Sequence, residues 1–320
     1  MVEYAKKQSV ETILIAGDLF DSERVKGSTV DILLSTIQDG KNIDFLYLKG
    51  NHDEAQRAFL GRELPDNLKT FSDKWTCYRY GDVCVTGVEL TDRNFESIYD
   101  QLQLEESNTN IVMMHGQVST QCGPDQICLQ RLRGKNIDYL ALGHLHSHKC
   151  DRLDIRGEYC YSGCLEGRGF DECGDKGFVL LDVVDGRCYS EFIPFSKRTL
   201  FDVPVDITGL TTIPEIHQAM NAAAEGISAD SLVKFTLCGT YALDTKKDFR
   251  FLLQNLEPRY YFVKIKDESR LQLEPSDYEH DISLKGEFIR TVMASDRTDA
   301  EKQKIITWGI QALKGEEIVI

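Results

Sequence analysis

The chain has 320 residues, of which 42% are apolar and 28% charged, a balance that excludes a disordered protein and predicts a buried core. The net charge of −15 excludes a protein that binds nucleic acid through a basic face of its own, so a phosphate-bearing substrate would have to be met by local groups, metal ions or a partner. No apolar run reaches the roughly 18 residues of a membrane helix, and the N-terminal residues are too polar for an export signal, so we expect a cytoplasmic protein with no membrane segment.

Ten cysteines are scattered along the chain without a CxxC pair. In a large chain without an export signal, this spacing predicts reduced thiols rather than disulfides and argues against a zinc ribbon. We therefore expect a fold without covalent cross-links.

Short apolar runs alternate with helical patterns through the first 190 residues, which is typical of a layered α/β domain. Four runs are strand-like, and each is followed at once by polar residues with a glycine beside them; they cover residues 11–16, 43–48, 110–114 and 137–142. In such a sheet, ligands gather beyond the carboxyl ends of the strands, where glycine lets the backbone turn sharply. We therefore expect the four strand ends to point to one place.

The rest of the chain predicts three further kinds of structure. Strands at 158–162, 177–184 and 188–194, with a glycine-rich loop at 163–177, predict a second, antiparallel sheet. A strand, helix, strand, helix, strand pattern then predicts a small α+β domain, at residues 201–207, 214–225, 232–238, 244–255 and 260–266. Helical spacing returns at 284–294 and 298–313, where an apolar stripe either packs on its own domain or binds a partner; the stripe consists of Ile305, Ile306, Trp308, Ile310 and Leu313.

The residues that follow the four predicted strands have side chains able to bind metal: Asp18, Asn51, His52, Asp53, His115, His144 and His146. A carboxylate, a carboxamide oxygen and several imidazoles form a mixed oxygen and nitrogen site. Such a site is better suited to Mn²⁺, Fe²⁺ or Zn²⁺ than to metals that prefer thiolate ligands. Any one of these histidines could be an ordinary hydrogen-bonded imidazole, but the whole set at converging strand ends favours a metal centre.

The motifs GDLFDS, KGNHDE, HG and GHLH, in this order and at these spacings, resemble those of the calcineurin-like metallophosphoesterases. Within that family, residues 159–184 and the small α+β domain resemble the DNA-repair exonucleases of the SbcD type, more closely a YhaO-like branch from Firmicutes. The resemblance implies a four-layer sandwich, with two mixed sheets flanked by helices. It also implies a division into a metallophosphoesterase domain at 1–198, an α+β capping domain at 199–276 and a C-terminal helical segment at 277–320 that could bind a partner.

The resemblance also implies a role for each candidate residue in a site with two Mn²⁺ ions. Asp18 would bridge both ions, His146 would bind the first, and the remaining ligands of the second would be Asn51, His115 and His144. His52 would lie near the scissile phosphate as the catalytic imidazole, with Asp53 holding its ring and raising its basicity, so that it can protonate the leaving oxygen.

One motif of the family is absent. The family begins with a strand that carries D-x-H and supplies two ligands of the first metal, but in this sequence no aspartate stands two residues before any histidine. We therefore expect one Mn²⁺, bound by Asp18, Asn51, His115 and His144. A start codon assigned too far downstream, a truncated version of the protein or a naturally shortened protein would each explain the absence, and the intact remaining motifs favour the first two.

The leading functional hypothesis is a metal-dependent nuclease that acts on DNA in repair, paired with an SbcC-like ATPase; a homodimer is left open. One alternative is a small-molecule phosphodiesterase or phosphatase. Another is a non-catalytic scaffold that binds the ATPase without hydrolysing phosphodiesters, because its first metal site is incomplete.

Overall fold

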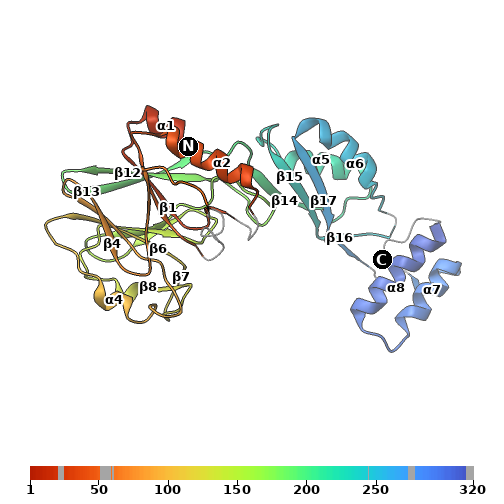
Figure 1. Ribbon diagram of the computed structural model, residues 1–320. Helices are drawn as coiled ribbons and strands as arrows, with labels where there is room; N and C mark the ends of the chain where they lie inside the picture. The colour runs from red at the N-terminus through yellow and green to blue at the C-terminus, as the bar shows by residue number, and fades with distance from the viewer. Residues whose placement is uncertain (21–24, 51–58, 60, 244, 273–277, 315–320) are drawn as a thin grey trace. The chain divides into compact units, whose positions relative to one another are not determined.

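The fold is described by a computed structural model that covers residues 1–20, 25–50, 59, 61–243, 245–272 and 278–314 (Figure 1). The chain divides into two compact units, Met1–Thr199 and Leu200–Ile320. In the part of the chain that the structure describes, no helix is long and apolar enough to cross a membrane.

The first sheet of unit 1 is parallel and has the order β1-β2-β3, with β1 at Thr12–Ala16, β2 at Asp44–Leu48 and β3 at Leu68–Thr70. The predicted strands 11–16 and 43–48 are thus confirmed. Helices α1 (Val2–Lys7) and α2 (Gly27–Asp39) cover one face, where Ala5 and Ile37 pack against Ile13 and Phe45.

The second sheet is mixed and has the order β10-β11-β9-β6-β5-β4. Its strands are β4 (Thr76–Tyr80), β5 (Val83–Gly87), β6 (Thr109–His115), β9 (Tyr139–Gly143), β10 (Lys149–Arg152) and β11 (Glu158–Tyr161). Strand β6 is buried along its whole length, because Met113 packs with Leu46 and Leu48 of the first sheet while Met114 packs on the opposite face with Tyr99 of α4 (Ile98–Gln101). The two sheets therefore lie face to face, with helices outside, as the predicted α/β sandwich requires. Both sheets were predicted to be mixed, but only the second is; the described strands of the first all pair in parallel.

A hairpin of β12 (Gly177–Val184) and β13 (Arg187–Pro194) follows. Its two-residue turn consists of Asp185 and Gly186, both at positive φ (50° and 74°), which is typical of the type I′ turn that matches strand twist. The antiparallel hairpin was predicted, but the placement of residues 158–162 with it was wrong: β11 pairs in parallel with β9 in the larger sheet, which its apolar sequence alone could not distinguish. Two short parallel strands, β7 (Gln117–Ser119) and β8 (Gln126–Cys128), and the 3₁₀ turn η1 (Leu129–Arg131) lie between β6 and β9 along the chain.

Unit 2 contains a parallel sheet of order β14-β15-β17, with β14 at Leu200–Asp206, β15 at Leu232–Cys238 and β17 at Phe262–Asp267. Helix α5 (Ile213–Ala223) connects the first two strands and begins with a capping box between Thr212 and Glu215. Helix α6 (Phe249–Leu256), followed by the 3₁₀ turn η2 (Glu257–Arg259), starts later than the predicted residue 244, because the side chain of Asp248 accepts the Phe251 backbone N–H and caps the helix there. Residue 244 itself lies outside the described residues.

The C-terminal helices are α7 (Leu284–Met293) and α8 (Asp299–Lys314), and strands β16 (Thr240–Tyr241) and β18 (Arg270–Leu271) precede them. The predicted apolar stripe is split between two environments. Ile306 and Ile310 are buried against Ile289 of α7, whereas Trp308 and Leu313 are 36% and 48% exposed. Of the two alternatives, packing of the stripe on its own domain is therefore correct for only part of the stripe.

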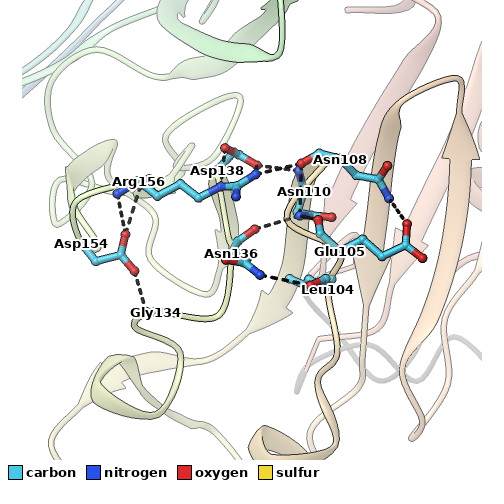
Figure 2. A network of polar contacts seen from close by, with 10 residues as sticks. Leu104, Glu105, Asn108, Asn110, Gly134, Asn136, Asp138, Asp154 and Arg156 are labelled. Carbon is cyan, nitrogen blue, oxygen red and sulfur yellow. Dashed lines mark hydrogen bonds and ion pairs between the residues drawn. The ribbon is translucent and has the colours of Figure 1, made fainter.

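A polar network ties together the amino ends of β6 and β9 (Figure 2). The Arg156 guanidinium donates to both oxygens of the Asp138 carboxylate, at 2.9 and 3.0 Å, and Asp138 Oδ2 accepts the Asn110 backbone N–H at 2.7 Å. In the turn between β10 and β11, Asp154 accepts backbone N–H groups from Gly134, Arg156 and Gly157. The network therefore fixes this turn to the beginnings of two central strands.

The expectation of reduced thiols alone was wrong, because Cys150 and Cys160 form a disulfide. They lie directly opposite each other in the antiparallel pair of β10 and β11, with Cα atoms 4.2 Å apart. This proximity comes from strand pairing, which a separation of ten residues in the sequence does not reveal.

Candidate metal centre

Three strand ends bring together Asp18, His115 and His144, whose ligand atoms all lie within 4.8 Å of one another. Asp18 follows β1 by two residues, His115 is the last residue of β6, and His144 directly follows β9. The three strands belong to both sheets of the sandwich, so the site forms only when the sheets pack together. Its donor set, one carboxylate and two imidazoles, is suited to a divalent ion of the Mn²⁺, Fe²⁺ or Zn²⁺ type.

The imidazole of His115 is held in one orientation. Its Nδ1 lies 2.8 Å from the Ala16 carbonyl oxygen, which can only accept, so Nδ1 carries the hydrogen and Nε2 keeps its lone pair. Nε2 points to Asp18 Oδ2 at 3.4 Å, and the ring, 4% exposed, stands nearly perpendicular to that of His144 at 5.5 Å between centroids. The backbone of β1 thus selects the tautomer of His115 that can bind a metal, which shows that these residues fit such an ion.

The backbone around the cluster is unusual. Asp18 and His144 both have positive φ values, 52° and 109°, which residues with a side chain adopt at a cost and which concentrate at functional sites. A Cβ atom at Gly143 would collide with the Ala16 carbonyl, and one at Gly17 would collide with the His115 ring. Glycine at these two positions is what allows β1, β6 and β9 to approach closely enough for the three ligands to meet.

His146 lies beside the cluster and is fixed from two sides. Its Nδ1 lies 2.5 Å from Glu172 Oε1, and its carbonyl oxygen accepts from the buried Lys176 ammonium at 2.8 Å. Burial acts to raise the pKa of Glu172, but the Arg168 backbone N–H and the His146 ring outweigh it and hold that pKa below its ordinary value. Glu172 is therefore an anion that orients the His146 ring, as carboxylates do behind metal-binding histidines.

The sequence did not single out Glu172, Lys176 or Arg168. All three lie in the glycine-rich loop at 163–177, which contributed to the resemblance to the SbcD-type exonucleases but supplied no candidate site residue. An acidic residue beside glycines next to a histidine motif is too common a pattern to identify a partner of His146.

A cavity of about 330 Å³ opens beside the site and is lined by Asp18, His144 and His146, together with Ser162, Glu166 and Arg168 among others. In this acidic protein, Arg168 places a guanidinium, which is ion-paired with Glu172 at 3.8 Å, next to the candidate metal ligands. The cavity can therefore receive an anionic group close to a bound ion.

The predicted residues Asn51, His52 and Asp53 lie outside the described residues, so their roles stay predictions. Gly50, which precedes them, is described, and its Cα lies so close to Asp18 that a Cβ atom would collide with the Asp18 backbone. The structure thus brings together Asp18, His115 and His144, and places His146 on the wall of the same cavity.

Residues 1–148 match the family model described as calcineurin-like phosphoesterase. Over 234 residues the chain is 26% identical to the uncharacterized metallophosphoesterase YhaO of Bacillus subtilis (strain 168), an alignment that covers 68% of this chain and 56% of that protein. Over 233 residues it is 26% identical to the DNA double-strand break repair protein Mre11 of Aeropyrum pernix, covering 65% of this chain and 56% of that protein. The chain thus spans little more than half the length of these two relatives.

Proposed function

We propose, from the match of residues 1–148 to the calcineurin-like phosphoesterase family, that the chain hydrolyses phosphodiester bonds of DNA with the help of a divalent metal ion. The observation that carries the proposal is the convergence of Asp18, His115 and His144 at a cavity that Arg168 also lines. Similarity to a DNA double-strand break repair protein supports DNA as the substrate.

A divalent ion in this site would polarise the phosphate and lower the pKa of a bound water. Backbone and side-chain groups of the protein would orient the ligands, bind the phosphate and supply the proton. The Ala16 carbonyl accepts a hydrogen bond from His115 Nδ1, so Nε2 is the nitrogen of that ring that can bind the metal. The Glu172 carboxylate accepts a hydrogen bond from His146 Nδ1 and fixes the orientation of the His146 ring. The guanidinium of Arg168 would bind a non-bridging phosphate oxygen. His52, with its basicity raised by Asp53, is proposed to protonate the leaving oxygen.

The metal content of the chain can be measured directly. We expect one Mn²⁺ per chain, on Asp18, His115 and His144 with Asn51 as the fourth ligand. Elemental analysis of protein dialysed against MnCl₂ should give one ion per chain in the unmodified protein and none in His144→Ala. Two tightly bound ions would contradict the expectation of a single complete site.

The proposed activity can be tested with end-labelled linear duplex DNA and with bis-p-nitrophenyl phosphate, both in Mn²⁺. We expect the chain to shorten the DNA, His144→Ala to lose this activity, and His280→Ala to keep it, because His280 is an exposed histidine of unit 2. Cleavage of bis-p-nitrophenyl phosphate without any cleavage of DNA would instead identify a small-molecule phosphodiesterase. Bound metal with neither activity would identify a scaffold and overturn the proposal.

We further propose that the exposed part of α8 binds an SbcC-like ATPase. Trp308 and Leu313 remain accessible while Ile306 and Ile310 fill the core, so the helix can bind a partner without giving up its own packing. Trp308→Ser with Leu313→Ser should abolish co-purification with such an ATPase and leave the circular dichroism spectrum unchanged. A folded double variant that still binds the ATPase would place the docking surface elsewhere. Ile282→Ser, at a fully exposed isoleucine of the same unit, is the control.

A further inference from the structure

A second group of metal-binding side chains lies outside the candidate site. Cys150 of β10 and Cys160 of β11 face each other across the strand pair, and the Nδ1 atom of His148 lies 4.0 Å from the Cys160 sulfur. One ligand atom from each of the three residues falls within 4.8 Å of the others. His148 follows the GHLH motif by two residues and has no part in the proposed hydrolysis.

The surroundings hold these side chains in place but leave an approach from solvent. Cys160 is 1% exposed and packs in the core between the sheets, whereas Cys150 and His148 are exposed. The His148 ring stacks on Phe192 of β13, with centroids 4.4 Å apart and planes at 24°.

We propose that His148, Cys150 and Cys160 form a site for a thiophilic divalent ion such as Zn²⁺ when the disulfide is reduced. Two thiolates and one imidazole are a softer donor set than the carboxylate and imidazoles of Asp18, His115 and His144, so this site should discriminate against Mn²⁺, which the Asp18 site accepts. Three protein ligands leave a fourth, tetrahedral position for water or another ligand.

The site exists in two states that exclude each other. A dithiol reductant breaks the Cys150–Cys160 bond, supplies two electrons and two protons to the two sulfurs, and itself becomes a disulfide. Binding of Zn²⁺ then releases the two thiol protons, because the thiolate is the metal ligand. The ion and the disulfide thus compete for the same pair of sulfur atoms.

Co²⁺ is the probe that distinguishes this site from the one at Asp18. A thiolate ligand gives Co²⁺ a sulfur-to-metal charge-transfer band in the near ultraviolet, and the Asp18 site contains no thiolate. We expect metal-stripped, dithiothreitol-reduced protein to develop this band with two equivalents of Co²⁺, enough to fill the Asp18 site as well, and to lose it when excess Zn²⁺ is added. Protein with the disulfide intact should show no band.

Variants then test each ligand. Cys150→Ser and His148→Ala alter exposed side chains, so the fold should persist, and each should weaken Co²⁺ binding at least about tenfold, since even the loss of a residue behind a ligand costs 10- to 100-fold. Cys77→Ser, at an exposed cysteine outside the cluster, should change nothing. The proposal is overturned if reduced protein shows no charge-transfer band, or if Cys150→Ser keeps the full band. Neither result depends on whether the chain cleaves DNA.

Discussion

The two ends of the paired strands β6 and β9 carry similar polar residues but use them differently. At the amino ends, Asp138 and Asp154 accept hydrogen bonds from backbone N–H groups, and Asp138 also pairs with Arg156. At the carboxyl ends, the carboxylate of Asp18 and two imidazoles converge on one point beside a cavity. An aspartate therefore stabilises the fold where the protein supplies donors to its oxygens, and it is suited to a metal where its neighbours are other possible ligands.

The largest expected effect comes from Asp18→Asn, which removes the charge but keeps a residue type that tolerates positive φ. We expect the rate of Mn²⁺-dependent hydrolysis of bis-p-nitrophenyl phosphate to fall at least about 100-fold. Loss of a residue that only supports a metal ligand already lowers metal affinity or activity about 10- to 100-fold. The melting temperature should change little. Asp154→Asn, the same chemical change at the other end of the strands, should leave the rate intact. Equal rate losses in both variants would show that the two ends are not functionally distinct.

A smaller effect is expected from Glu172→Gln, which keeps the shape of the side chain that orients His146 but removes its charge. Turnover should fall by about 10- to 100-fold, because His146 lines the cavity beside the candidate ligands and would lose its orientation, whereas the single Mn²⁺ should stay bound. Asp171→Asn, at an exposed carboxylate of the same loop that is not among the residues lining the cavity, is the matched control. If both variants behave alike, Glu172 has no role in positioning His146.

The smallest effect is expected from Asp154→Asn on stability. Burial acts to raise the pKa of Asp154, but three backbone hydrogen bonds hold it below its ordinary value. Because the folded-state pKa is lowered, the stabilisation is fully present above the ordinary pKa of about 3.9 and is lost as the pH falls through the lower, folded-state value.

Urea unfolding should show that Asp154→Asn costs about 1.5 kcal/mol at pH 7, the scale of a hydrogen bond to a charged group. Near pH 3 the difference from the unmodified protein should shrink. Asp92→Asn, at an exposed carboxylate of the same unit, should be neutral at both pH values. A constant difference at all pH values would mean that the charge of Asp154 is not what stabilises the turn.

Much of the fold could be predicted from apolar periodicity. Strand β12 covers the predicted residues 177–184, and β1, β2 and β6 end within one residue of the predicted boundaries, because buried strands are continuous apolar runs. Strands β4 and β5 were missed because their runs are short and mixed with polar residues. The pairing of β11 with β9 was missed because sequence reveals a strand more readily than it reveals its neighbour.

The candidate site shows the same limit. Converging strand ends led to Asp18, His115 and His144, since the carboxyl ends of adjacent parallel strands meet at one edge. Glu172 and Lys176 could not be predicted, because they come from a loop whose path back to His146 is set by tertiary packing. The same applies to the Cys150–Cys160 pair, which depends on the register of β10 and β11.

The two-residue turn at Asp185 and Gly186 has a consequence for the order of folding. Its hairpin, β12 and β13, pairs residues that are close in sequence, so closing it costs little chain entropy, whereas β1 and β2 must meet across an intervening helix. Isolated hairpins close in roughly 1–10 μs, long before such distant segments find each other. Val179 and Leu181 of the hairpin then offer an apolar surface on which β2 and β6 can assemble. In pulse-labelling hydrogen exchange during refolding, the amides of β12 and β13 should therefore gain protection before those of β1.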